Sequence, residues 1–229
     1  MNKGLLILGT SLLLAACGQR AGEPAQEKAA SAAAIGQTEA AAEGAITEYY
    51  EDGTVRAKYT RTDGQLQGQY LRYRPGGDLE SSSFYKDNLL EGTLTLYYES
   101  GNRVRSTQEY HAGKRSGPLT IYYRDGMVRS VFGYKDDKLK GELVDYYPNG
   151  QIRQVMRVED GQVIGQFISY YENGRIMEQF YFQNGFTVGP YVSYYENGQI
   201  RRKGSYHKGE RTGRWTEYTQ DGKETVYQY

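Results

Sequence analysis

The residues that could act as acid–base groups, nucleophiles or metal ligands are few and widely spaced in this sequence. There are two histidines, His111 and His207, and a single cysteine, Cys17. Zinc sites and nucleophilic catalysis both need several such groups close together, and the sequence has no histidine–cysteine cluster of zinc spacing. The histidines occupy equivalent positions four repeats apart, which at a strand spacing of about 4.8 Å predicts a separation of roughly 38 Å. We therefore expect a protein that is not an enzyme and that uses no metal or cofactor.

Positive and negative side chains balance in this chain. Lysine plus arginine and aspartate plus glutamate each number 28. No net field would attract a polyanion, so we expect no nucleic-acid partner. Tyrosine, with 24 residues, carries much of the apolar content, which disfavours a conventional thick core.

Glycines recur with a period of 24 residues and predict a tandem repeat. A second glycine series precedes the first by nine residues. One step, from Gly101 to Gly126, is 25 residues long, and we place the extra residue at Asn102, where a turn absorbs it without a change of strand register. The first series, called the turn glycines below, consists of Gly53, Gly77, Gly101, Gly126, Gly150, Gly174, Gly198 and Gly222.

Each repeat contains two runs of aromatic and β-branched residues around a turn. In the sixth repeat Asn173-Gly174 separates two such runs and predicts a two-residue type I′ hairpin turn. A second turn around Asn184-Gly185 leads into the next strand. The predicted register pairs four sets of residues: Glu172 with Arg175, Tyr171 with Ile176, Tyr170 with Met177 and Phe167 with Phe180. The fold class is therefore all-β, an elongated single-layer antiparallel meander of about sixteen strands built from tandem hairpin repeats.

Two tyrosine positions define the two faces of this sheet. The first tyrosine stands four residues before the turn glycine in all eight repeats, and the second stands three residues before it in six. Adjacent strand residues point to opposite faces, so the two tyrosines lie on opposite sides. The second tyrosine shares its face with residues such as Phe167, and we expect aliphatic residues such as Ile176 opposite it. This face is predicted to be the apolar one.

The face of the first tyrosine is the candidate binding face. In the predicted register this tyrosine lies opposite arginine in five of seven repeats. Such a ladder could bind a protein through aromatic residues, or a glycan or lipid headgroup through stacking and charge. Screening a thin sheet from water would explain the same residues. The candidate binding residues are Tyr97, Tyr122, Tyr146, Tyr170, Arg105, Arg129 and Arg153.

The N-terminus has the pattern of a secretory leader. An apolar stretch runs from Leu5 to Leu14 and ends in Leu14-Ala15-Ala16-Cys17. The stretch is too short for a stable transmembrane helix. Small residues before a cysteine resemble the lipobox of bacterial lipoproteins, in which the cysteine is acylated after cleavage. An ordinary signal with an incidental cysteine is the alternative.

The lipobox resemblance implies a lipid-anchored protein of the cell envelope. Residues 1–17 are then the signal peptide and Cys17 is the lipid attachment site. In a Gram-negative host, Gly18 after the cysteine favours the outer membrane. Residues 18–43, rich in alanine, glutamate and glutamine, cannot bury enough apolar surface to fold and are expected to be a flexible tether. Residues 44–229 hold about eight hairpin repeats.

The repeat pattern Gly-x-aromatic-x-x-Tyr-Tyr-x-Asn-Gly-x-Ile resembles the MORN (membrane occupation and recognition nexus) repeat, specifically its second variant. Residues 165–175 and 189–199 match best, and the resemblance covers roughly residues 44–229. Two repeats depart from it, because Arg74 and Thr219 replace the second tyrosine. The resemblance implies a stacked hairpin sheet with a binding role. It also extends to the bacterial YwqK-type group, described as antitoxins of toxin–antitoxin systems.

These observations lead to two hypotheses of different class. The first is a non-enzymatic, lipid-anchored envelope protein whose sheet binds another protein, with an antitoxin or immunity role against a toxin as one form of it. The second is a surface or scaffold module that binds glycan or lipid headgroups. The association with toxins comes from the resemblance alone.

Overall fold

The computed structural model describes residues 43–229, which form strands and turns without a helix. No helix in this range is therefore long and apolar enough to cross a membrane. The predicted signal peptide (1–17), the lipid site Cys17 and all but the last residue of the predicted tether (18–43) lie outside the described residues. The strands are β1 (Gly44–Tyr49), β2 (Val55–Thr62), β3 (Gln65–Tyr73), β4 (Leu79–Lys86), β5 (Leu89–Leu90), β6 (Gly92–Tyr97), β7 (Val104–His111), β8 (Lys114–Tyr122), β9 (Val128–Lys135), β10 (Lys138–Leu139), β11 (Gly141–Tyr146), β12 (Ile152–Glu159), β13 (Gln162–Tyr170), β14 (Ile176–Gln183), β15 (Phe186–Tyr194), β16 (Ile200–His207), β17 (Glu210–Tyr218) and β18 (Glu224–Gln228).

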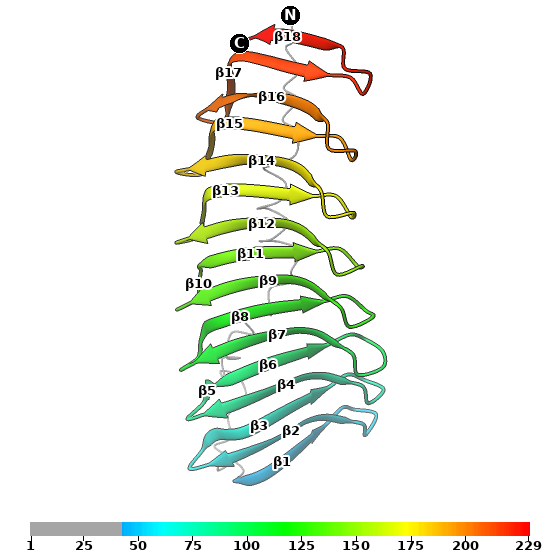
Figure 1. Ribbon diagram of the computed structural model, residues 1–229. Coiled ribbons are helices and arrows are strands. Elements are labelled where there is room, and N and C mark those ends of the chain that lie inside the picture. Colours follow the sequence, from blue (N-terminus) through cyan, green and yellow to red (C-terminus); the bar gives the residue numbers. More distant parts are fainter. Residues whose placement is uncertain (1–42) are drawn as a thin grey trace, which may run out of the picture. The chain divides into compact units, whose positions relative to one another are not determined.

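The strands form one antiparallel sheet in which each row pairs with the next along the chain (Figure 1). β5 and β6 share one row beside β4, and β10 and β11 share one row beside β9. The eighteen strands therefore make sixteen rows. Within residues 43–229, β1 pairs only with β2 and β18 only with β17, so the sheet is open. The predicted single-layer meander is confirmed.

Seven of the eight turns at the turn glycines have three residues. In the sixth repeat the Tyr171 N–H donates to the Arg175 carbonyl (2.8 Å), and the Gly174 N–H donates to the Tyr171 carbonyl (2.9 Å). Gly174 has a φ of 81°, whereas Asn173 is not at positive φ. This is a type I turn followed by one residue at positive φ. The predicted type I′ turn at Asn173-Gly174 is wrong.

The type I′ turns connect the strands at their opposite ends, across the sheet from the three-residue turns (Figure 1). Gln183 pairs with Phe186 across Asn184 and Gly185, whose φ values are 52° and 77°. Both central residues are therefore at positive φ, as this turn requires. Three-residue and two-residue turns alternate along the chain, and each kind uses an Asn-Gly pair in this repeat.

The three-residue turn is accompanied by a bulge that changes the register. Phe167 pairs with Phe180 as predicted, but Tyr170 pairs with Ile176. Met177 is the extra residue on β14, where two residues oppose one on β13. Three predicted pairs are therefore wrong: Glu172 with Arg175, Tyr171 with Ile176 and Tyr170 with Met177.

A second bulge in each repeat explains the other glycine series. Between the pairs Val155–Ile168 and Arg157–Ile164, β13 has three residues against one on β12. Gly165 lies in this bulge with a φ of 70°, which a residue with a Cβ adopts only under strain. Bulges increase local twist, and the strand direction in Figure 1 changes steadily from β1 to β18.

The extra residue of the third repeat lies where the sequence placed it. The Tyr98 N–H donates to the Arg103 carbonyl (2.8 Å), so this loop is one residue longer than the others. Asn102 is at a φ of 49° within the loop. Tyr97 still pairs with Val104, the equivalent of the Tyr170–Ile176 pair. The strand register is unchanged, as predicted.

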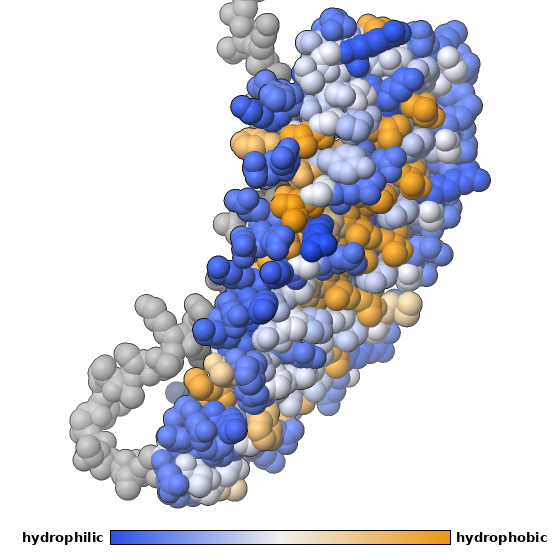
Figure 2. Space-filling model, turned by 60° about the vertical axis from the view of Figure 1, so that its left-hand side comes forward, coloured by the Kyte–Doolittle hydropathy of each residue, from blue (hydrophilic) through white to orange (hydrophobic). Residues whose placement is uncertain are grey.

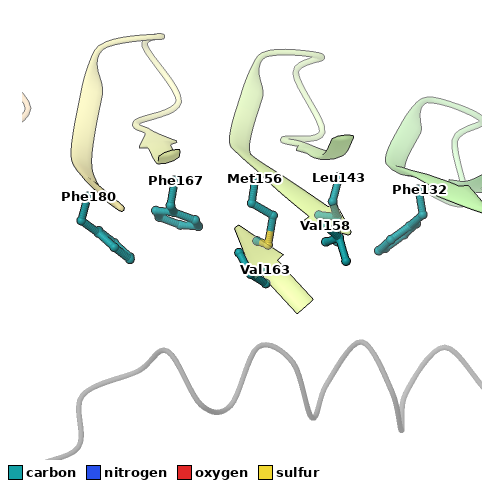
Figure 3. Packing of buried hydrophobic residues seen from close by; sticks show 7 residues of the cluster. All are labelled: Phe132, Leu143, Met156, Val158, Val163, Phe167 and Phe180. Atoms are coloured by element: carbon teal, nitrogen blue, oxygen red, sulfur yellow. The ribbon is translucent and has the colours of Figure 1, made fainter. Parts of the chain in front are cut away.

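One face of the sheet carries the core. Phe167 and Phe180 stack with ring centroids 4.7 Å apart. The second tyrosine Tyr171 lies four residues after Phe167 and therefore on this core face, whereas Tyr170 lies on the opposite, outer face. The side chains of the core cluster leave their strands on one side (Figure 3): Phe132, Leu143, Met156, Val158, Val163, Phe167 and Phe180.

The C-terminal repeats extend the core with one larger and one smaller residue, Trp215 and Gly204. Trp215 is fully buried, and its Nε1 donates to the Ser205 carbonyl (3.0 Å). Its ring packs against Gly204, where a Cβ would lie 2.2 Å from the ring. Gly204 occupies the position of Phe180 one repeat earlier. A glycine at this position therefore makes room for the largest side chain of the core.

Candidate protein-binding face

The predicted tyrosine–arginine ladder is wrong. The bulge places the aliphatic residue two positions after the turn glycine, rather than the arginine three positions after it, opposite the first tyrosine. The aliphatic residues, expected on the core face, consequently lie on the outer face. The observed pairs are Tyr49 with Val55, Tyr73 with Leu79, Tyr97 with Val104, Tyr122 with Val128, Tyr146 with Ile152, Tyr170 with Ile176 and Tyr194 with Ile200.

The three candidate arginines, Arg105, Arg129 and Arg153, are bulge residues. Arg153 contacts a core-face carboxylate, with its Nη2 3.0 Å from Asp145 Oδ2. The equivalent arginine of the seventh repeat, Arg201, lies 5.8 Å from the ring centroid of a second tyrosine. Arg105 and Arg129 are exposed. The seven candidate residues therefore do not form one alternating surface.

Asp145 joins three strands through its carboxylate. Its Oδ1 accepts a hydrogen bond from Ser130 (2.5 Å), and its Oδ2 accepts bonds from Gln154 (2.6 Å) and Arg153 (3.0 Å). The side chain is only 7% exposed, and a carboxylate that far from water needs such partners. The cluster contains no histidine or cysteine. Its arrangement suits cohesion of β9, β11 and β12.

The second tyrosines form a set of contacts between repeats that the sequence analysis missed. Each hydroxyl donates to the backbone carbonyl of the first tyrosine in the next repeat, at 2.6–2.8 Å. We call this set the tyrosine ladder. Burial raises the pKa of Tyr147 and Tyr171, which favours the neutral, donating hydroxyl. The ladder bonds are Tyr50 to Tyr73, Tyr98 to Tyr122, Tyr123 to Tyr146, Tyr147 to Tyr170, Tyr171 to Tyr194 and Tyr195 to Tyr218.

The two departures from the tyrosine pattern have physical explanations. Arg74 replaces the second tyrosine of its repeat, and its Nη2 donates to the Tyr97 carbonyl (2.8 Å). The guanidinium therefore makes the same inter-repeat bond as a phenol. Thr219 belongs to the last described repeat, and its hydroxyl bonds within its own turn, to Asp221 and Lys223. The signal available in the sequence was that a long donor, arginine, substitutes for tyrosine.

The outer face carries an apolar row that is continuous from β9 to β13. Val144 pairs with Val131 on one side and with Val155 on the other, and Val155 pairs with Ile168. Each alternates with a core-face residue and so points outward. Figure 2 shows hydrophobic side chains gathered most densely over the middle of the array. The outer stripe is defined as the seven tyrosine–aliphatic pairs together with Val131, Val144, Val155, Ile168 and Val192.

Parts of the outer stripe are open to solvent. Tyr49 is 60% exposed, and Ile152 and Ile200 are each 39% exposed. An antiparallel sheet with one solvated face normally alternates apolar and polar residues. In β9, β11, β12 and β13 the residues between the core positions are apolar as well: Val131, Val144, Val155 and Ile168. The outer stripe is therefore the candidate binding surface of the described chain.

The remaining reactive groups are not brought together. His111 lies in β7 and His207 in β16, eight rows apart. The His111 Nδ1 is 2.9 Å from Glu91 Oε1, and its side chain is 78% exposed. In residues 43–229 no group of three or more histidine, cysteine, aspartate or glutamate side chains could hold a metal ion.

The geometry defines a class of protein: an open sheet of tandem hairpins in which each repeat bonds to the next. Within that class, four segments match the family model of the MORN repeat variant, at residues 42–63, 139–160, 163–184 and 187–208. The chain therefore contains MORN-type repeats. The other repeats share their turns and glycine conformations. No curated protein matches the chain.

Two solved structures show limited similarity. The crystal structure of TcdB2-TccC3-Cdc42 aligns with 80% of this chain and 14% of its own chain, at 11% identity and a TM-score of 0.22. A protein of unknown function from Bacteroides fragilis aligns with 81% of this chain and 90% of its own, at 7% identity and a TM-score of 0.12. The chain thus spans about a seventh of the length of the first structure.

Proposed function

We propose that this chain is a non-enzymatic binding protein that recognises another protein through the outer stripe. The observation that carries the proposal is the apolar row from Val131 to Ile168 on the face opposite the core. Tyrosine and aliphatic side chains that remain partly open to solvent are typical of protein interfaces. We include no catalysis, because the two histidines are eight rows apart.

A glycan or lipid-headgroup ligand has less support. That alternative relied on arginines interleaved with the first tyrosines. Arg153 is instead paired with Asp145 (3.0 Å), and Arg56 at the same repeat position is paired with Glu48 (2.6 Å). Paired guanidiniums offer a weaker site for phosphate or sulfate groups. A protein partner fits the apolar outer stripe better.

Photo-crosslinking tests the outer stripe directly. A crosslinkable residue at Ile152 or Ile200 should capture the same partner in the native envelope, whereas one at the exposed turn residue Lys208 should not. The double variant Ile152→Asp, Ile200→Asp should lose the partner and keep its thermal unfolding midpoint within a few degrees. Equal capture from all three positions, or an undiminished complex with the double variant, would contradict the proposal.

We propose further that the mature protein is attached to the membrane through an acylated Cys17, which would place it at the outer membrane of a Gram-negative host. The support is the Leu14-Ala15-Ala16-Cys17 sequence. Radiolabelled fatty acid should enter the wild-type protein and not Cys17→Ala. Equal labelling of the two proteins would refute the anchor.

An antitoxin or immunity role is the more specific form of the proposal. It is supported by the resemblance to bacterial antitoxins built from such repeats, not by any contact described above. Deletion of the gene should make cells sensitive to a toxin encoded nearby or delivered by sibling cells. A deletion strain that is no more sensitive than the parent, together with the absence of a neighbouring toxin gene, would reject this role.

A further inference from the structure

A half-open cavity lies beside the last described hairpin, between the seventh and eighth repeats. It has a volume of about 220 Å³ and lies among β16, β17 and β18. Its walls include Tyr195 and Arg201 from the seventh repeat and Thr219 and Thr225 from the eighth. Tyr195 is a second tyrosine, so the cavity opens on the core-face side of the three-residue turns rather than on the outer stripe.

The cavity lies where the repeat pattern loses two large side chains. Thr219 stands 24 residues after Tyr195, and Thr225 stands 24 residues after Arg201. In the last described repeat, two threonines thus replace a tyrosine ring and a guanidinium. Thr219 does not reach into the space, because its hydroxyl bonds to Asp221 within its own turn. The cavity therefore lies where six other repeats have the ring of a second tyrosine.

The charges around the cavity favour an anionic, aromatic occupant. Arg202 is paired with Glu217, with Nε 2.7 Å from Oε1. Arg201 lies 5.8 Å from the Tyr195 ring centroid and has no carboxylate within ion-pair distance among residues 43–229. The Tyr195 hydroxyl is already bonded to the Tyr218 carbonyl (2.8 Å). The site therefore offers one uncompensated guanidinium beside an aromatic ring.

We infer that this cavity binds one aromatic side chain of a partner polypeptide, next to an acidic residue that pairs with Arg201. The volume is below the roughly 300–1,000 Å³ of sites for drug-sized ligands and cofactors, so it suits a single ring. The inference rests on the proposed role as a protein-binding scaffold and adds a second contact point to the outer stripe. Affinity for an isolated short peptide should be low, with a dissociation constant on the order of 1 mM.

Peptide titration followed by amide NMR tests the inference on the purified protein. The probe is acetyl-Glu-Tyr-Glu-amide, and the same peptide with alanine in place of tyrosine separates ring binding from charge binding. The tyrosine peptide should shift the amides of Thr219 and Thr225, and the alanine peptide should not. Equal shifts with both peptides, or shifts outside this repeat, would overturn the inference.

Two variants make the test specific. Thr219→Tyr supplies the missing ring from the chain itself, as six other repeats do, and should abolish peptide binding with the fold retained. Arg201→Ala should weaken binding about tenfold, whereas Arg129→Ala, at the same position of an inner repeat, should not change it. Undiminished binding to Thr219→Tyr would refute the site. If the tyrosine peptide does not bind this cavity while crosslinking through Ile152 still captures the partner, the inference is refuted and the proposed outer-stripe interface stands.

Discussion

The hydroxyl of Tyr147 donates a hydrogen bond to the backbone carbonyl of Tyr170, 2.7 Å away in the next repeat. This side-chain bond joins two successive repeats in addition to the backbone pairing between their strands. Removal of the hydroxyl in Tyr147→Phe should lower the free energy of unfolding by about 1 kcal/mol, because the carbonyl loses a partner while the ring stays in place. Denaturant unfolding monitored by circular dichroism measures the change.

Tyr146→Phe is the matched control for this variant. Tyr146 is the neighbouring first tyrosine on the outer face, and its hydroxyl has no hydrogen bond within residues 43–229. Its loss should change the free energy of unfolding by less than about 0.5 kcal/mol. If both variants destabilise the protein equally, the tyrosine ladder does not contribute to stability.

The ladder also predicts a loss of stability at alkaline pH. Burial raises the pKa of Tyr147 and Tyr171 above the ordinary value near 10. A raised pKa contributes stability that is complete below the unfolded pKa and is lost as the pH rises through the folded pKa. The free energy of unfolding should therefore fall as the pH rises above about 10 and through the raised folded pKa values of these tyrosines. The double variant Tyr147→Phe, Tyr171→Phe should show a shallower decline, and an unchanged slope would argue against the ladder.

The buried carboxylate of Asp145 gives a comparison between two arginines at the same repeat position. Arg153→Ala removes one of its partners and should cost about 1–3 kcal/mol, below the range for a fully buried pair because Arg153 is 43% exposed. Arg129→Ala removes an exposed arginine and should cost less than about 0.5 kcal/mol. Thermal and denaturant unfolding of both variants measure the two losses of unfolding free energy. Equal losses would show that the Arg153–Asp145 ion pair contributes nothing specific to stability.

The packing of Trp215 on Gly204 predicts a steric coupling. A Cβ at Gly204 would lie 2.2 Å from the ring, so Gly204→Ala should destabilise the protein by about 1–3 kcal/mol. Trp215→Phe in the same chain should recover part of this loss, because the smaller ring leaves room for a methyl group. A double-mutant cycle in denaturant measures the coupling. Additive losses would mean that the two side chains do not share the space.

The sequence predicted the features that depend on side-chain periodicity. The Phe167–Phe180 pair, the core face and the position of Asn102 follow from an alternation of two residues anchored on a regular glycine spacing. These features persist because the bulge at Met177 restores the alternation before Phe180 is reached. The pairs between this bulge and the turn are shifted by one residue, so the alternation did not predict them correctly.

The turn types could not be separated from the dipeptides alone. Asn173-Gly174 and Asn184-Gly185 have the same sequence, yet one belongs to a three-residue turn and the other to a type I′ turn. A type I turn followed by glycine and a type I′ turn both need glycine at positive φ. The turn has three residues instead of the predicted two, so Ile152 rather than Arg153 lies opposite Tyr146. Arg153 contacts Asp145 instead, and the expected arginine ladder is absent from the outer face.

The direction of the tyrosine ladder has a consequence for how such a chain can change length. Every donor stands one repeat before its acceptor, so each pair of adjacent tyrosines accepts a bond from the repeat before it and donates one to the repeat after it. Recombination between two equivalent codons would delete or duplicate a whole number of repeats and leave each phenol facing a carbonyl of the usual kind. The length of the sheet, and with it the extent of the outer stripe, is thus free to vary by genetic slippage without a compensating change elsewhere in the described repeats.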